Sequence, residues 1–284
     1  MTTAANPDFD PEAARVALDW VRRIVARYFR LEVIGAENLP RGRSMIVGCH
    51  SGVMPYDAAL TLVAIQQATG RFARAVGDDF FARLAFVETF LRRRGAIVGR
   101  RSEATNLLRA GHMLLVFPGG AVDMTRPIWR DPYRVLPHKG FAPGRGGYLK
   151  VALATQSPII PLAVVGAEEA HMLLATFPPI ARLFSVPFFP FVAFPVPLPV
   201  KIYVRFGRPI HLDADPKVAR NQAVVDRLNR RVRRAVQDLI DDTLRRRHGI
   251  IWSTYDAESA SRRPAQERRR TAPRRSRKPD SSAS

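Results

Sequence analysis

Residues 45–57 read Met-Ile-Val-Gly-Cys-His-Ser-Gly-Val-Met-Pro-Tyr-Asp. The first three residues are apolar, as expected of a short buried strand, and Pro55 can begin a helix that carries Asp57 in its first turn. This order places His50 at the carboxyl edge of a sheet. A carboxylate that holds one imidazole nitrogen as N–H leaves the other nitrogen able to accept a proton from a hydroxyl. The stretch therefore indicates a general base.

The sequence on either side alternates between apolar runs and helical patterns. Expected strands cover residues 31–34, 45–47, 74–76, 96–98, 113–117, 159–165 and 201–206. Expected helices cover residues 55–69, 79–93, 103–110 (with Ser102 as N-cap) and 147–155. This alternation predicts an α/β fold with a mostly parallel sheet flanked by helices. Because reactive groups gather at the carboxyl ends of such strands, His50, Arg100 and Pro118 are expected at one edge.

The two ends of the chain differ from this central pattern. Residues 1–30 are expected to form a polar tail and an amphipathic helix, with Ala17, Val21, Ile24 and Tyr28 on one face and arginines on the other. Residues 31–250 form the predicted folded domain, which ends in a long helix from Pro216 to about His248 with Asp215 as its N-cap. Residues 251–284 are rich in arginine, lack apolar periodicity and are expected to be a disordered basic tail.

Composition narrows the class of protein further. The formal net charge is +20, which indicates an anionic partner such as a membrane surface, a phosphorylated ligand or nucleic acid. Cys49 is the single cysteine, so an intrachain disulfide framework is excluded. We expect neither a transmembrane helix nor a signal peptide. Cys49, His50 and His112 lack the paired spacing of a zinc site, so no metal is expected.

Residues 177–200 interleave large apolar side chains with seven prolines. Prolines at this density prevent a continuous helix, and an exposed loop of this composition would present a large apolar area. The segment either caps the core or contacts lipid. Together with the basic amphipathic helix, it predicts peripheral attachment to the cytoplasmic face of a membrane, although a helix packed on the domain with a solvated basic face explains the N-terminal pattern equally well.

Three further segments accompany residues 45–57. Residues 95–101 read Gly-Ala-Ile-Val-Gly-Arg-Arg, residues 116–123 read Val-Phe-Pro-Gly-Gly-Ala-Val-Asp, and residues 159–169 read Ile-Ile-Pro-Leu-Ala-Val-Val-Gly-Ala-Glu-Glu. Their order and spacing resemble the four blocks of the glycerolipid acyltransferase superfamily, the lysophosphatidic acid acyltransferase-like enzymes. The resemblance covers about residues 31–212 and implies a glycerol-3-phosphate acyltransferase-like fold.

Two departures from the family pattern are informative. His50 and Asp57 are separated by six residues rather than the usual four. The third block usually reads Phe-Pro-Glu-Gly, whereas Gly119 replaces the glutamate here and makes the block similar to that of the diacylglycerol and monoacylglycerol acyltransferase branch. Loss of that carboxylate favours a neutral or unusual acceptor.

The resemblance implies specific roles. His50 would deprotonate an acceptor hydroxyl, Asp57 would orient His50, and the oxygen would attack an acyl thioester directly, without an acyl-enzyme. Backbone N–H groups at Gly119 and Gly120 could stabilise the developing negative charge. Arg100, and more weakly Lys139, Arg145 and Lys150, could bind phosphate. The candidate substrate-binding residues are Arg100, Phe117, Pro118, Gly119, Gly120, Lys139 and Pro161; for Pro161 a structural role is an equally good account.

The expected function is therefore an O-acyltransferase that acts on a lipid hydroxyl of a lysophospholipid or of a mono- or diacylglycerol-type acceptor. Acyl-CoA or acyl carrier protein would be the co-substrate, with no further cofactor. Ser51 is not in a Gly-x-Ser-x-Gly elbow, so the sequence does not indicate a serine hydrolase. The alternative is a non-catalytic basic protein that binds lipid or nucleic acid on an acyltransferase fold; the basic tail favours it, and the His50–Asp57 pair opposes it.

Overall fold

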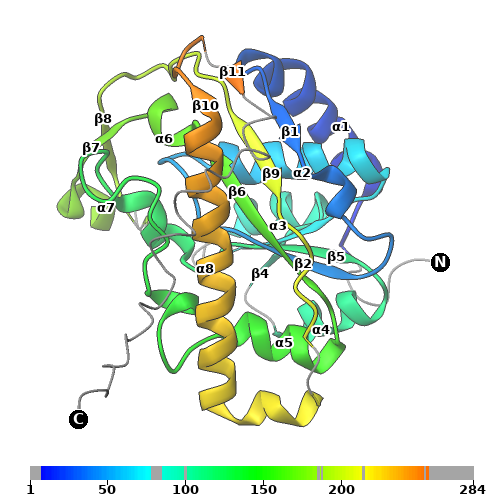
Figure 1. The fold of residues 1–284 in the computed structure, drawn as a ribbon. Helices are drawn as coiled ribbons and strands as arrows, with labels where there is room; N and C mark the ends of the chain where they lie inside the picture. Colours follow the sequence, from blue (N-terminus) through cyan, green and yellow to red (C-terminus); the bar gives the residue numbers. More distant parts are fainter. Residues whose placement is uncertain are drawn as a thin grey trace, which may run out of the picture.

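The computed structural model describes residues 8–77, 85–98, 101–183, 186, 188–212, 215–252 and 254–255. It has the predicted α/β architecture (Figure 1). The strands are β1 Glu32–Ile34, β2 Ser44–Val47, β3 Arg74–Gly77, β4 Ile97–Val98, β5 Met113–Val116, β6 Ile159–Val165, β7 Leu173–Thr176, β8 Pro190–Val192, β9 Tyr203–Phe206, β10 Arg247–His248 and β11 Thr254–Tyr255. The α-helices are α1 Pro11–Trp20, α2 Tyr56–Thr69, α3 Ala85–Arg93, α4 Arg101–Arg109, α5 Gly147–Thr155, α6 Ala167–Ala170, α7 Pro178–Leu183 and α8 Gln222–Arg246.

Within the described residues, one seven-stranded sheet has the order β1-β9-β6-β2-β5-β3-β4. The strands from β6 to β4 pair in parallel, whereas β9 is antiparallel to β6 and parallel to β1. The prediction of a mostly parallel sheet is therefore confirmed. Because β2 lies between β5 and β6, the segments that follow these three strands meet at one edge of the sheet.

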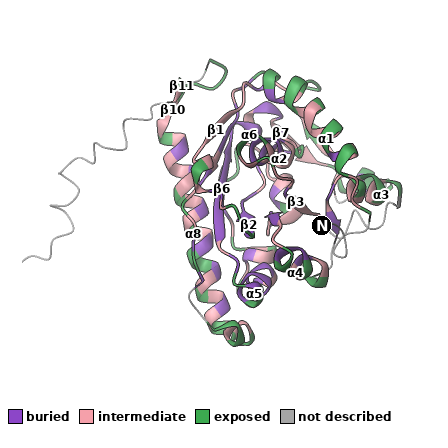
Figure 2. Cartoon of the chain, turned by 90° about the vertical axis from the view of Figure 1, so that its right-hand side faces the viewer, coloured by how far each residue is buried: buried purple, intermediate pink, exposed green. Residues whose placement is uncertain are grey.

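Two apolar layers cover the sheet. Met45 and Val47 of β2 point into a core formed with α4, α5 and α8, and Ile46 points into the opposite core, formed with α2 and the end of the N-terminal helix. This alternation follows from the two-residue period of a strand. All residues of β6 are buried, as expected for a strand covered on both faces. Figure 2 shows the buried strands between helices whose outer faces are exposed.

The N-terminal helix departs from its predicted pattern. After α1 the chain forms a π-helical turn from Val21 to Ala26, and the added residue per turn shifts the faces of the helix. Ala26 and Phe29 are consequently buried against the domain, whereas Ile24 and Tyr28 are exposed. The prediction that Ile24 and Tyr28 share a face with Val21 is wrong, because it assumed a uniform period of 3.6 residues.

Other boundaries also differ from the predictions. Ser102 lies inside α4 and does not cap it. Asp215 caps only a 3-10 turn, Pro216–Arg220, and Asn221 then caps α8 through the N–H groups of Ala223 and Val224, so the predicted helix is interrupted. The first part of the predicted helix 79–93 lies outside the described residues. Thr254 and Tyr255, within the predicted tail, pair with β10.

Candidate active site

His50 and Asp57 form the polar centre of the site. His50 Nδ1 donates to Asp57 Oδ2 at 2.8 Å, and the Asp57 side chain is fully buried while 15% of the His50 side chain is exposed. With the proton on Nδ1, the imidazole lone pair lies on Nε2, the nitrogen that can take a proton from a hydroxyl. The geometry therefore suits a general base held by a carboxylate.

The loop between the two residues explains how a six-residue separation still forms this pair. Gly52 has a φ of +82°, and a Cβ there would collide with the carbonyl of Ala167, so the turn requires glycine. The Ser51 N–H donates to Asp57 Oδ2 at 2.9 Å. The carboxylate therefore holds both the ring of His50 and the backbone of the loop that precedes α2.

The segment after β5 packs directly on this pair. The Phe117 ring stacks on the His50 ring with a centroid distance of 4.0 Å and an interplanar angle of 16°. The carbonyl of Pro118 accepts a hydrogen bond from Gly140 N–H at 2.8 Å, which joins this segment to the loop that contains Lys139. The first and third blocks therefore meet at His50, as expected for segments that follow the neighbouring strands β2 and β5.

The two glycines of the third block have different roles. The Gly120 N–H donates to the Phe117 carbonyl at 3.0 Å and is engaged in a turn with a φ of +56°. It is therefore not available to bind an oxyanion in this conformation, contrary to our expectation. Gly119 lies against the carboxylate of Asp123, a buried residue to which the sequence assigned no role.

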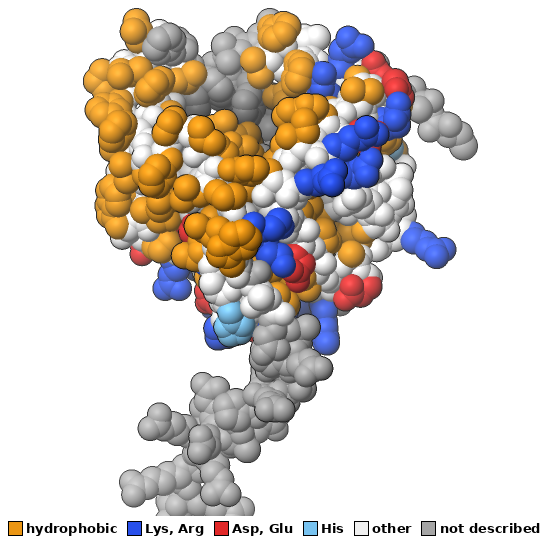
Figure 3. Space-filling view, turned by 90° about the horizontal axis from the view of Figure 1, so that it is seen from above, with side chains coloured by type: hydrophobic (Ala, Val, Ile, Leu, Met, Phe, Trp, Pro, Cys, Tyr) orange, Lys and Arg blue, Asp and Glu red, His pale blue; other side chains and the backbone are white. Residues whose placement is uncertain are grey.

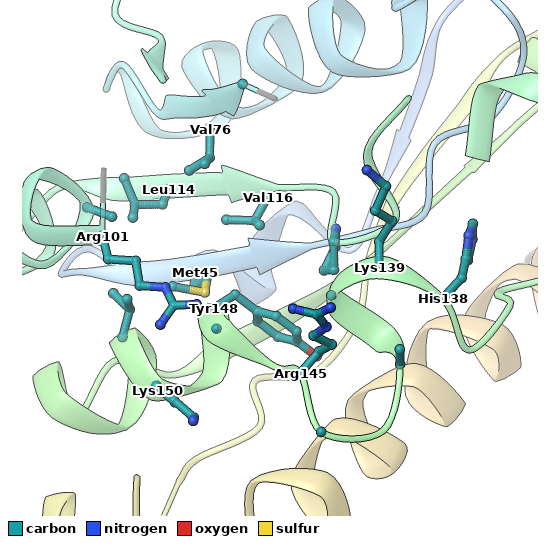
Figure 4. A pocket seen from close by; sticks show the side chains of 18 residues that line it. Met45, Val76, Arg101, Leu114, Val116, His138, Lys139, Arg145, Tyr148 and Lys150 are labelled. Atoms are coloured by element: carbon teal, nitrogen blue, oxygen red, sulfur yellow. The ribbon is translucent and has the colours of Figure 1, made fainter. Parts of the chain in front are cut away.

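A cavity of about 910 Å³ adjoins the third block (Figure 4). Its apolar wall comes from the strands β2, β3 and β5 and from α4 and α5, and its polar wall carries four cationic side chains. These cations are Arg101, Lys139, Arg145 and Lys150. The cavity also reaches Pro118 and His138. An apolar interior with a cationic margin suits a molecule that has both an acyl chain and phosphate groups.

Three of the four predicted phosphate ligands line this cavity. Lys139, Arg145 and Lys150 line the cavity, and so does Arg101, which the sequence did not single out. Arg100 lies outside the described residues. Pro161 is buried in β6, opposite Val47, and its carbonyl accepts from Gly207 N–H at 2.8 Å. It is not among the residues that line this cavity.

A second polar cluster lies behind the His50 loop. Both carboxylate oxygens of Glu168 accept from Tyr133 N–H, at 3.0 and 3.1 Å, and burial raises the pKa of Glu168 to about 7. Burial also raises the pKa of the Cys49 thiol well above its ordinary value, which disfavours Cys49 as a nucleophile. No group of three or more acidic, histidine or cysteine side chains that could hold a metal occurs among the described residues.

Comparisons with known proteins agree with this architecture. A family model described as Acyltransferase matches residues 30–165. An uncharacterized protein of Mycobacterium leprae is 34% identical over 257 residues, which cover 86% of this chain and 68% of that protein. The chain belongs to the acyltransferase family. Within the glycerolipid acyltransferase superfamily it resembles a mouse protein named DGAT1/2-independent enzyme synthesizing storage lipids, with 29% identity over 74% of this chain and 59% of that protein.

The fold of this acyltransferase is also similar to a solved structure. The lysophosphatidic acid acyltransferase PlsC of Thermotoga maritima aligns with a TM-score of 0.52 and 20% identity, over 84% of both chains. The family model and the relatives confirm the predicted superfamily, and this similarity confirms the predicted fold class.

Proposed function

We propose that this acyltransferase moves a fatty acyl group from an acyl thioester to a lipid hydroxyl, with His50 as general base. The observation that carries the proposal is the 2.8 Å contact between His50 Nδ1 and the buried Asp57 carboxylate. The name of the mouse relative supports a glycerolipid acceptor of the mono- or diacylglycerol type, and a lysophospholipid is the other acceptor to test.

The proposed reaction is a direct transfer. His50 Nε2 takes the proton from the acceptor hydroxyl as the oxygen bonds to the thioester carbonyl carbon. The carbon–sulfur bond then breaks, and the thiolate leaves and recovers the proton from the imidazolium. Asp57 stabilises the imidazolium that forms in between, because its negative charge lies against the Nδ1 proton. Neither step needs a covalent acyl-enzyme.

We place the acyl donor in the cavity beside Pro118. Its apolar wall offers burial to the acyl chain, and Arg101, Lys139, Arg145 and Lys150 offer charge to phosphate groups. Both acyl-CoA and acyl carrier protein present a phosphopantetheine thioester, so the chemistry of the cavity suits either donor.

We also propose that the protein acts at the cytoplasmic face of a membrane as a peripheral protein. Exposed apolar side chains between Phe177 and Val196 form an apolar patch, which consists of Phe177, Ile180, Leu183, Phe189, Phe191, Phe194 and Val196. Figure 3 shows hydrophobic side chains gathered on one part of the upper face and Lys and Arg side chains beside them. Tyr28 O–H donates to the Pro197 carbonyl at 2.5 Å, which joins the N-terminal helix to the chain directly after the patch. Apolar groups flanked by cations favour contact with an anionic bilayer.

None of the described helices has the length and apolar character needed to cross a bilayer.

The test measures release of free thiol from long-chain acyl-CoA, and in a separate assay from the acyl thioester of acyl carrier protein, with a panel of acceptors. The panel contains lysophosphatidic acid, monoacylglycerol, diacylglycerol and a long-chain alcohol. We expect acceptor-dependent release that is lost in His50→Ala. Equal release by the wild type and His50→Ala would contradict the mechanism, and absence of release with every donor and acceptor would favour a non-catalytic binding protein.

A further inference from the structure

Asp123 is a buried carboxylate that contacts two separate parts of the site. Its side chain is 1% exposed and lies in the 3-10 turn Gly120–Thr125 that follows the third block. Asp123 Oδ2 accepts from the His50 backbone N–H at 3.3 Å, and Asp123 Oδ1 accepts from His138 Nε2 at 2.7 Å. One carboxylate therefore joins the loop after β2 to the loop that borders the cavity.

The Asp123 carboxylate leaves room only for glycine at position 119. Gly119 has a φ of −72°, which any residue can adopt, so its backbone does not require glycine. A Cβ at position 119, however, would lie closer than 3.0 Å to the carboxylate carbon and to both oxygens of Asp123. The space in which a side chain at position 119 would stand is filled by the Asp123 carboxylate.

Burial of the negatively charged Asp123 side chain is unfavourable, and several neighbouring groups compensate for it. Burial raises the pKa of Asp123, and the positive charge of Arg126, a hydrogen bond from Cys49 and the imidazoles of His50 and His138 oppose that rise. An unpaired buried carboxylate would be strongly destabilising, and removal of a partner leaves the others uncompensated. Two of these partners are the catalytic histidine and His138, a residue that lines the cavity.

We propose that Asp123 is a positioning residue of the catalytic histidine, and that it supplies from position 123 the carboxylate that position 119 lacks. Asp57 holds the ring of His50, Phe117 stacks on that ring, and Asp123 holds the backbone of His50 from the opposite loop. These contacts together fix where Nε2 lies. Because His138 lines the cavity, Asp123 also connects the proposed donor site to His50. This inference rests on the proposed role of His50 as general base.

The geometry allows the carboxylate to be moved rather than only removed. Asp123→Ala empties the space beside Gly119, and Gly119→Asp in that background places a new carboxylate into the same space. Gly119→Asp alone would create a collision between two carboxylates. Asp123→Asn keeps the shape of the side chain while removing its charge. Asp131→Asn serves as a matched control, because Asp131 is exposed in the following loop.

The experiment measures kcat and KM for thiol release in these variants, with folding checked by circular dichroism and thermal unfolding. We expect kcat to fall about 100-fold in Asp123→Ala and about tenfold in Asp123→Asn, with the KM of the donor changed less than about threefold. The double variant Gly119→Asp/Asp123→Ala should recover at least about tenfold in kcat over Asp123→Ala, because the carboxylate is restored. Asp131→Asn should match the wild type.

Three outcomes would overturn the inference. One is wild-type kcat in Asp123→Asn while His50→Ala is inactive, which would leave the general base in place and remove the role of Asp123. Another is a folded double variant that is no more active than Asp123→Ala. The third is a loss of thermal stability that accounts for the whole loss of activity in Asp123→Asn. Full activity in His50→Ala would instead contradict the proposed function itself.

Discussion

Polar side chains are buried around His50, whereas apolar side chains are exposed between Phe177 and Val196. At the first region, the Asp57 and Asp123 carboxylates are almost fully buried, and both accept hydrogen bonds from the His50 loop. At the second, Leu183 is 78% exposed and Val196 is 67% exposed. Buried charge is tolerated only where it is paired, and exposed apolar area is stable in water only at a cost. In the first region the chain itself supplies partners for the buried charges, whereas in the second region the apolar side chains stay exposed, as expected of the proposed membrane contact.

The largest expected effect tests the buried polar groups around His50. Asp57→Asn should lower kcat by about 1,000-fold, because the amide no longer stabilises the imidazolium and favours a different orientation of the ring. The measurement is thiol release at saturating donor and acceptor. Asp19→Asn on the exposed face of α1 is the control and should leave kcat unchanged. An Asp57→Asn variant with more than about one tenth of wild-type kcat would contradict the role of the pair.

A smaller effect tests the cationic margin of the cavity. Arg145→Ala with Lys150→Ala should raise the KM for acyl-CoA about 10- to 100-fold, because charge-assisted bonds to phosphate are lost. The KM for a short acyl thioester of N-acetylcysteamine, which carries no phosphate, should stay within about twofold. Arg109→Ala, an exposed arginine outside the cavity, is the control. Equal changes in KM for both donors would place the phosphates elsewhere.

The apolar patch is tested by weakening its contact with lipid. Leu183→Ser with Val196→Ser should lower the partition coefficient on anionic vesicles at least about tenfold, since two large apolar groups no longer enter the bilayer. Thermal stability should be unchanged because both side chains are exposed in the free protein. Phe86→Ser, an 83% exposed side chain outside the patch, is the control. Unchanged sedimentation with vesicles would argue against insertion of the patch.

The smallest expected effect concerns stability and pH. Because the pKa of Glu168 is raised to about 7 in the folded protein, the folded state binds a proton more tightly than the unfolded state between about pH 4.5 and pH 7. The free energy of unfolding therefore falls as the pH rises through this window. Glu168→Gln should remove that fall and raise the free energy of unfolding by about 1–3 kcal/mol at pH 8, with little change at pH 4.

Urea titrations at the two pH values measure this effect. Glu37→Gln, at an exposed position, should show no such dependence on pH. A gain at pH 4 equal to that at pH 8 would show that the effect is not due to ionisation of Glu168.

Much of the fold followed from local patterns in the sequence. Short apolar runs bounded by glycine and proline located the strands of the main sheet, and their alternation with helices predicted parallel pairing. These signals are local because strand and helix periods are properties of neighbouring residues. Predictions that assumed a uniform helical period of 3.6 residues were wrong where the helix type changes. This happens in the π-helical turn Val21–Ala26 and at Asn221, where a 3-10 turn ends and α8 begins.

The residues of the candidate site also fall into those that local sequence patterns could identify and those that they could not. His50 and Asp57 could be assigned from their residue types and their positions at the end of a strand and the start of a helix. Asp123, His138 and Arg101 could not, because their roles depend on contacts with residues distant in the sequence, such as the 2.7 Å contact between Asp123 and His138. The filling of the Cβ space at Gly119 by the Asp123 carboxylate is likewise a property of packing. The sequence by itself determined which candidate residues lie at the end of β2 and the start of α2. Only the tertiary structure decided which groups surround them, because burial and distance arise when separate loops meet at one edge of the sheet.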